Sequence, residues 1–68
     1  MIQDLYSGEE LCSWLYTSDN PNQDDIQFVN VQFYQNGVSL EIPLDIFKKV
    51  VEEIMKSARA LSVIEARN

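Results

Sequence analysis

The dipeptide Asn36-Gly37 stands between two segments, residues 26–34 and 38–42, whose apolar residues alternate. A two-residue type I′ turn needs positive φ at both central positions, and Asn and Gly adopt that conformation at low cost. In the resulting register the facing pairs are Phe33 with Leu40, Val31 with Ile42 and Val29 with Leu44. The turn and the alternation place the same apolar side chains on one face. The sequence therefore predicts an antiparallel β-hairpin with strands at about 26–35 and 38–43.

The other face of this hairpin is mostly polar but includes Phe28 and Tyr34. An antiparallel sheet commonly packs one face on a core and leaves the other in water. The two aromatic side chains are therefore either covered by another element or exposed to a partner. The sequence leaves both alternatives open.

A short N-terminal helix is predicted at about 8–17. Ser7 and Glu10 have the spacing of a capping box, and Tyr6 and Leu11 have that of a hydrophobic staple. An apolar stripe at helical spacing follows, made of Leu11, Trp14 and Leu15.

A long amphipathic helix is predicted at about 45–66, with Asp45 as its N-cap after Pro43. Its apolar stripe contains Phe47, Val50, Val51, Ile54, Met55, Ala58 and Leu61. The prediction is an α+β fold of order α-β-β-α, in which this helix packs on the hairpin. Residues 1–68 are expected to form a single small domain.

The core of such a domain is small, and the chain has one cysteine, so no disulfide within it can add stability. A helix of about 22 residues runs roughly 33 Å, whereas strands of seven residues run roughly 23 Å. The C-terminal half of the helix therefore overhangs the hairpin. Either the first helix fills the gap or a second copy of the chain does. We expect a homo-oligomer, a dimer, with Ala58, Leu61 and Ile64 in its interface.

Charge is divided unevenly along the chain. Residues 1–47 contain no Lys or Arg and carry a net charge of −8, whereas residues 48–68 carry +2, for a total of −6. Such a field repels phosphate backbones and anionic lipids and attracts cationic surfaces. A basic protein partner is therefore expected, and nucleic acid is not.

Several kinds of chemistry lack their usual residues. There is no histidine, and Cys12 has no neighbouring base or cation in the sequence that would activate it. The polar segment at residues 17–25 does not match a calcium loop, because it lacks the required glycine and the final glutamate. We expect no enzyme, no cofactor and no metal site.

No basic segment followed by an apolar one begins the sequence, and no apolar run has the length of a membrane span. A lone cysteine is typical of a reducing compartment, or of a small buried side chain. The expected location is cytoplasmic, without membrane association.

Residues 38–54 resemble the strand and first helix of ribbon–helix–helix repressors. In that family the strand pairs between two chains, and its exposed face enters the major groove of DNA. The resemblance departs at Ser39 and Glu41, which stand where a basic strand face would be needed. A ribbon–helix–helix-like transcriptional regulator is therefore an alternative to the main functional prediction, and not the main prediction itself.

The sequence predicts a small, acidic, non-catalytic protein-interaction module that acts as a dimer, or as a subunit or inhibitor bound to a basic protein. A small-ligand-binding protein with a pocket of Trp14, Tyr16 or Tyr34 is a further alternative. The simpler alternative to a contact role for the candidate residues is that they are only solvated charges and partly packed side chains. These candidates are Glu9, Glu10, Asp19, Asp24, Asp25, Phe28 and Tyr34.

Overall fold

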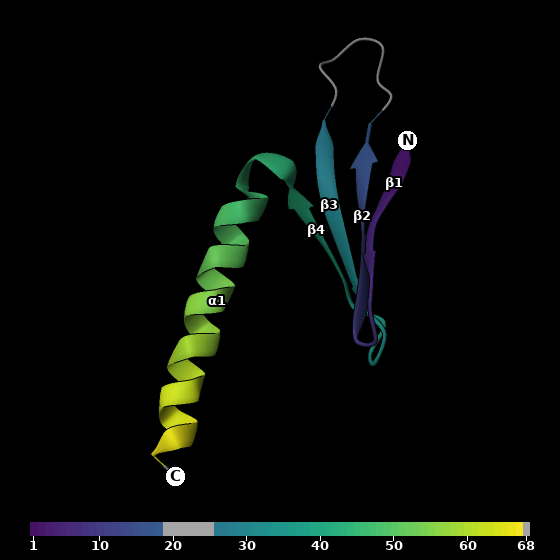
Figure 1. Cartoon of the computed structure of the whole chain (residues 1–68). Helices are drawn as coiled ribbons and strands as arrows, with labels where there is room; N and C mark the ends of the chain where they lie inside the picture. The colour runs from purple at the N-terminus through teal and green to yellow at the C-terminus, as the bar shows by residue number, and fades with distance from the viewer. Residues whose placement is uncertain (19–25, 68) are drawn as a thin grey trace.

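The computed structural model describes residues 1–18 and 26–67. Along the chain, four strands precede one long helix (Figure 1). They are β1 (Ile2–Ser7), β2 (Leu11–Thr17), β3 (Gln27–Phe33), β4 (Ser39–Pro43) and α1 (Leu44–Ala66). The strands form one antiparallel sheet in the order β1-β2-β3-β4. The α+β class is confirmed, but the predicted order α-β-β-α is wrong.

The predicted helix at residues 8–17 is instead part of a β-hairpin. Gly8 N donates a hydrogen bond of 2.9 Å to Leu11 O, which closes the turn between β1 and β2. The ring of Tyr6 lies against Gly8, so a side chain at this position would meet the ring unless the ring moved. In the segment Leu11–Thr17 the residues Cys12, Trp14 and Tyr16 alternate with Leu11, Ser13 and Leu15, and pairing with both β1 and β3 satisfies its main-chain groups. Long-range pairing has therefore overridden a local capping signal.

The predicted β3–β4 hairpin is confirmed, but its register is wrong by two residues. Val31 faces Leu40 and Val29 faces Ile42. The loop spans residues 34–37, with hydrogen bonds from Gly37 N to Phe33 O and from Phe33 N to Val38 O. Of the two residues Asn36 and Gly37, only Gly37 adopts positive φ, at 70°, so the two-residue turn does not form. A shift of two residues leaves every side chain on its predicted face.

One face of the sheet, here called the uncharged face, carries no Asp, Glu, Lys or Arg among the described residues. Its apolar members from the three strands β2, β3 and β4 are Leu11, Leu15, Val29, Val31, Phe33, Leu40 and Ile42. Polar positions on the same face are filled by Gln3, Ser13, Thr17 and Gln27, together with Tyr6.

The opposite face, here called the acidic face, mixes aromatic, polar and carboxylate side chains. It holds Ile2, Asp4, Ser7, Cys12, Trp14, Tyr16, Phe28, Asn30, Gln32, Ser39, Glu41 and Pro43. Cys12, predicted within a helix and buried, lies instead on β2 and is partly exposed.

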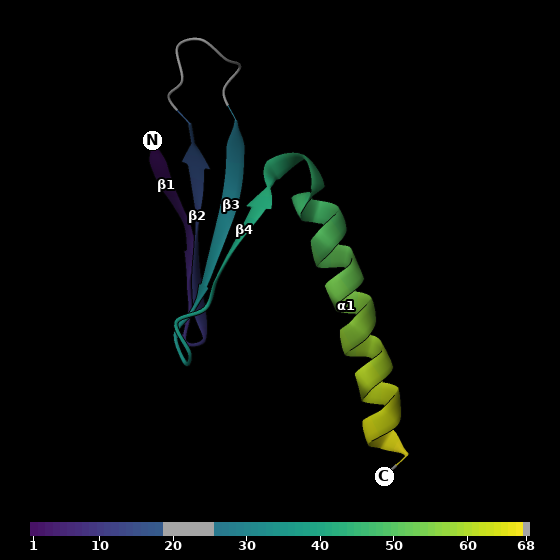
Figure 2. The ribbon, with the colours of Figure 1, turned by 180° about the vertical axis from the view of Figure 1, so that it is seen from behind.

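The long helix α1 agrees with the prediction to within one residue at its start. Pro43 is its N-cap and makes no side-chain capping bond, and Asp45 lies in the first turn rather than at the cap. The helix reverses direction after β4 and diverges from the sheet toward its C-terminus (Figure 2). Only Phe47 and Val50 in α1 are partly covered. The prediction that half of the helix lies on the sheet is wrong, because Val51 and Ile54 are exposed.

The core is correspondingly small. Within the described ranges Val29 is the only buried side chain, with 1% of its surface exposed. It lies on the uncharged face opposite Ile42, near the point where α1 begins and contacts β3 and β4. The first turns of α1 therefore cover this end of the uncharged face and leave the rest open.

Replacing Val29 by alanine should lower the free energy of unfolding by about 2 kcal/mol, because it removes buried methyl groups from the one filled position. The measurement is urea unfolding followed by circular dichroism. Val63→Ala is the matched control: Val63 is 53% exposed, and its loss should change stability by less than about 0.5 kcal/mol. Equal effects of the two substitutions would contradict this location of the core.

Candidate functional site

The acidic face is ordered in rows that cross the four strands. The row Ile2–Tyr16–Phe28–Pro43 is apolar and aromatic. Its neighbour is the row Asp4–Trp14–Asn30–Glu41, in which carboxylates occupy both edge strands. The third row, Ser7–Cys12–Gln32–Ser39, is polar. Aromatic surface thus lies directly beside two exposed acids.

The row containing Trp14 is the centre of the candidate site. Asp4 and Asn30 are its direct neighbours on β1 and β3, and Glu41 follows Asn30 on β4. Trp14 is partly exposed, and both carboxylates are exposed. Residues 1–47 contain no Lys or Arg, so no cation of the four strands neutralises these acids.

A second cluster lies at the polar end of the same face. The Ser7 Oγ and Tyr34 Oη atoms are hydrogen-bonded at 3.1 Å, and Tyr34 N donates to Glu10 O at 3.0 Å. The neighbouring Cys12 Sγ lies 4.0 Å from Gln32 Oε1. These contacts join the β1–β2 turn to the loop after β3 and hold Tyr34 with 48% of its surface exposed.

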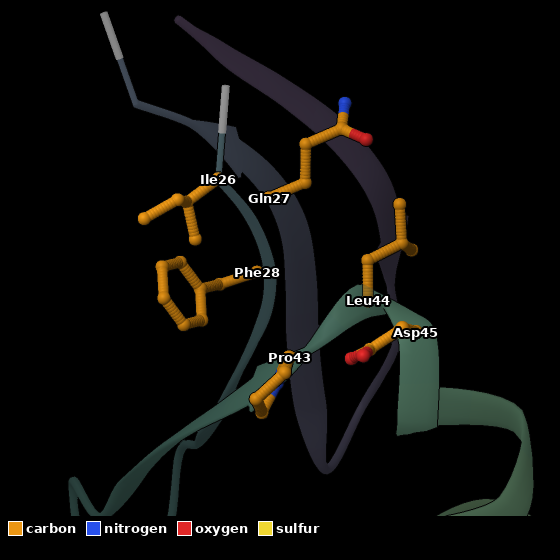
Figure 3. A pocket seen from close by; sticks show the side chains of 6 residues that line it. All are labelled: Ile26, Gln27, Phe28, Pro43, Leu44 and Asp45. Atoms are coloured by element: carbon orange, nitrogen blue, oxygen red, sulfur yellow. The ribbon is translucent and has the colours of Figure 1, made fainter. Parts of the chain in front are cut away.

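An open groove of about 510 Å³ lies at the other end of the sheet, where β4 passes into α1. Figure 3 shows Phe28 and Pro43 on one side of this junction and Gln27 and Leu44 on the other. Ile26 and Asp45 complete its lining. The groove therefore continues the apolar row of the acidic face around the start of the helix.

The structure brings some predicted contact residues together and separates others. Glu9 and Glu10 lie in the β1–β2 turn, and Glu10 is next to Tyr34. Phe28 lies at the opposite end of the face, beside Tyr16 and Pro43. Asp19, Asp24 and Asp25 lie outside the described residues, so their prediction is untested.

Sequence reasoning missed Asp4 and Glu41 as contact residues, and it considered Trp14 and Tyr16 only for a ligand pocket. The missed signal was the alternation of Cys12, Trp14 and Tyr16 against Leu11, Ser13 and Leu15. A helical interpretation of this segment put Trp14 beside Leu15 on one stripe. The strand instead places these two side chains on opposite faces of the sheet.

Comparisons with known protein families, curated proteins and solved structures find no match for this chain. In the described part of the chain, no group of three or more His, Cys, Asp or Glu side chains could hold a metal ion. A search of the same residues finds no helix with the length and apolar character needed to cross a membrane.

The negative field at Trp14 should be measurable by fluorescence quenching. Relative to a free tryptophan amide, Cs⁺ should quench Trp14 more strongly than I⁻ does, because Asp4 lies opposite it on β1. Asp4→Asn should reduce the ratio of the Cs⁺ and I⁻ quenching constants by about twofold at low salt. Glu53→Gln, on α1, removes one charge elsewhere and should leave the ratio unchanged. A ratio of the Cs⁺ and I⁻ quenching constants equal to that of the free tryptophan amide would contradict a negative field at Trp14.

Proposed function

We propose that this protein is a non-catalytic interaction module that binds a basic segment of a partner protein on the acidic face of its sheet. The observation that supports this most directly is the row in which Trp14 lies between strands that carry Asp4 and Glu41. The first 47 residues supply no Lys or Arg that could satisfy these acids within the sheet.

The row fits the chemistry of an arginine- or lysine-containing segment. A guanidinium or ammonium group over the face of Trp14 gains a cation–π interaction, which strengthens as the pair is removed from water. The carboxylates offer charged acceptors on either side. Trp and Tyr side chains are also the residues that most often dominate binding energy at protein interfaces. The neighbouring Tyr16 and Phe28 extend the aromatic surface.

The spacing of the acids suggests the form of the segment. Asp4 and Glu41 lie on the two edge strands, three strand spacings apart, which is about 14 Å. Residues four apart in an extended chain are separated by about 13 Å. An extended segment that crosses the strands, with basic residues about four positions apart, would therefore reach both carboxylates.

We favour this function over a ribbon–helix–helix regulator. In this chain β4 already pairs with β3, and α1 continues without a break to Ala66. Ser39 and Glu41 of β4 lie on the acidic face, and a carboxylate there would oppose phosphate groups.

A labelled arginine-rich peptide, followed by fluorescence anisotropy, tests the proposal. The wild-type chain should bind it with an affinity that falls as salt is raised. Asp4→Lys and Glu41→Lys should each weaken binding by about tenfold, or about 1.4 kcal/mol. Glu53→Lys makes the same change in net charge on the exposed helix and should weaken binding by less than about twofold.

Equal losses for all three charge reversals would indicate attraction to net charge alone and would contradict a site on the acidic face. A glutamate-rich peptide of the same length should show no binding. Tighter binding to duplex DNA than to the basic peptide would favour the regulator alternative instead.

A further inference from the structure

The chain exposes far more surface than a folded monomer of its mass. Its accessible area is 5811 Å², whereas a compact protein of 7.9 kDa exposes about 4,400 Å², an excess of about 1,400 Å². Its radius of gyration is 15.3 Å, against about 11 Å for a compact domain of this length. A stable protein–protein interface buries about 800 Å² on each partner. The excess is thus large enough to supply a complete interface.

Much of the exposed apolar surface lies on one stripe of α1. Ile54 and Leu61 are 57% and 55% exposed. Ala58 lies between them and Val51 lies about one turn before Ile54, on the same side of the helix. The lysines and arginines of α1 lie on the opposite side. An amphipathic helix is normally stabilised by packing its apolar stripe. Here the stripe has no cover after Val50.

The second uncovered surface is the uncharged face of the sheet. Leu40 is 44% exposed, and Leu11, Leu15, Val31 and Phe33 are each only partly buried. The first turns of α1 cover this face only near Val29. When a partner covers a face without charged residues, water is removed from it without the free-energy cost of burying a charge.

These two surfaces match each other in length, and the segments that carry them have net charges of opposite sign. The exposed part of the helix, residues 51–64, is about 21 Å long, and a seven-residue strand is about 23 Å long. The helix residues 44–67 carry a net charge of +1, and residues 1–43 carry −7. One helix would therefore lie along an uncharged sheet face and be attracted to the acidic remainder of that chain.

We infer that the occupant is a second copy of this chain, in a two-fold dimer in which α1 of each copy packs on the uncharged face of the other. One chain carries both halves of the complementary pair, so a single two-fold contact covers both surfaces on both copies. Its own α1 cannot cover the face in the observed arrangement, because the helix diverges from the sheet after its first turns (Figure 2). The inference stands independently of the proposed binding site, which lies on the other face.

Size-exclusion chromatography with light scattering, together with sedimentation equilibrium, tests this dimer. The full chain at micromolar concentration should have about twice the mass of 7.9 kDa. Ile54→Asp and Leu61→Asp should raise the dimer dissociation constant by about a hundredfold or more, because a carboxylate would be buried in an apolar contact. Val63→Asp is the matched control: Val63 is 53% exposed but lies on the charged side of α1, so the dissociation constant should change by less than about threefold.

A monomeric mass would overturn the inference. A radius of gyration near 11 Å for that monomer, measured by small-angle X-ray scattering, would mean that its own helix covers the sheet. A radius of gyration near 15 Å would mean that the surface is left for a different protein. A loss of dimer in Val63→Asp equal to that in Ile54→Asp would also overturn it. If the aspartate variants do not fold, the melting temperature of the unchanged chain still decides, because it must rise with protein concentration for a dimer and stay constant for a monomer.

Discussion

Main-chain pairing between four antiparallel strands is the interaction on which the rest of this structure depends. Among the described residues only Val29 has a fully buried side chain, so hydrophobic packing within one chain does little to fix the position of the helix. The continuous ladder from β1 to β4 instead defines which side chains share a face. Everything inferred here about recognition follows from that division into an uncharged face and an acidic face.

The two faces suit different kinds of contact. The uncharged face and the apolar stripe of α1 resemble two halves of one hydrophobic core. A single chain does not bring these two halves together. The acidic face has aromatic surface beside carboxylates, which suits reversible binding of a basic segment. In the proposed dimer the second copy covers the uncharged faces, and both acidic faces stay exposed. Such a dimer would bind two basic segments at once, which raises the apparent affinity for a partner that carries both.

The sequence was informative where one periodicity was unambiguous. Residues 45–66 contain no Gly or Pro and have a clear helical stripe, so the helix was predicted to within one residue. The alternation in residues 27–33 and 39–43 predicted the correct faces, even though the turn between them has four residues instead of two. A two-residue error in register preserves faces because strand side chains repeat every two residues.

The first seventeen residues could not be assigned from local signals. Ser7 and Glu10 fit a helix cap, and Leu11, Trp14 and Leu15 fit helical spacing, whereas the alternation of Cys12, Trp14 and Tyr16 fits a strand. What decides between them is pairing with β3, a long-range contact that does not appear in the local pattern. The same error displaced the candidate site, because Asp4, Trp14 and Glu41 become neighbours only when β1 and β2 join the sheet.

The central claim is that a second chain completes the core along α1 and the uncharged face. Hydrogen–deuterium exchange of the full chain at two protein concentrations tests it most directly. Amides of residues 51–64 and of β3 should become more protected as the concentration rises, whereas those of the β1–β2 turn at residues 8–10 should not change. Protection of residues 51–64 that is the same at both concentrations, in a chain of monomeric mass, would contradict the account.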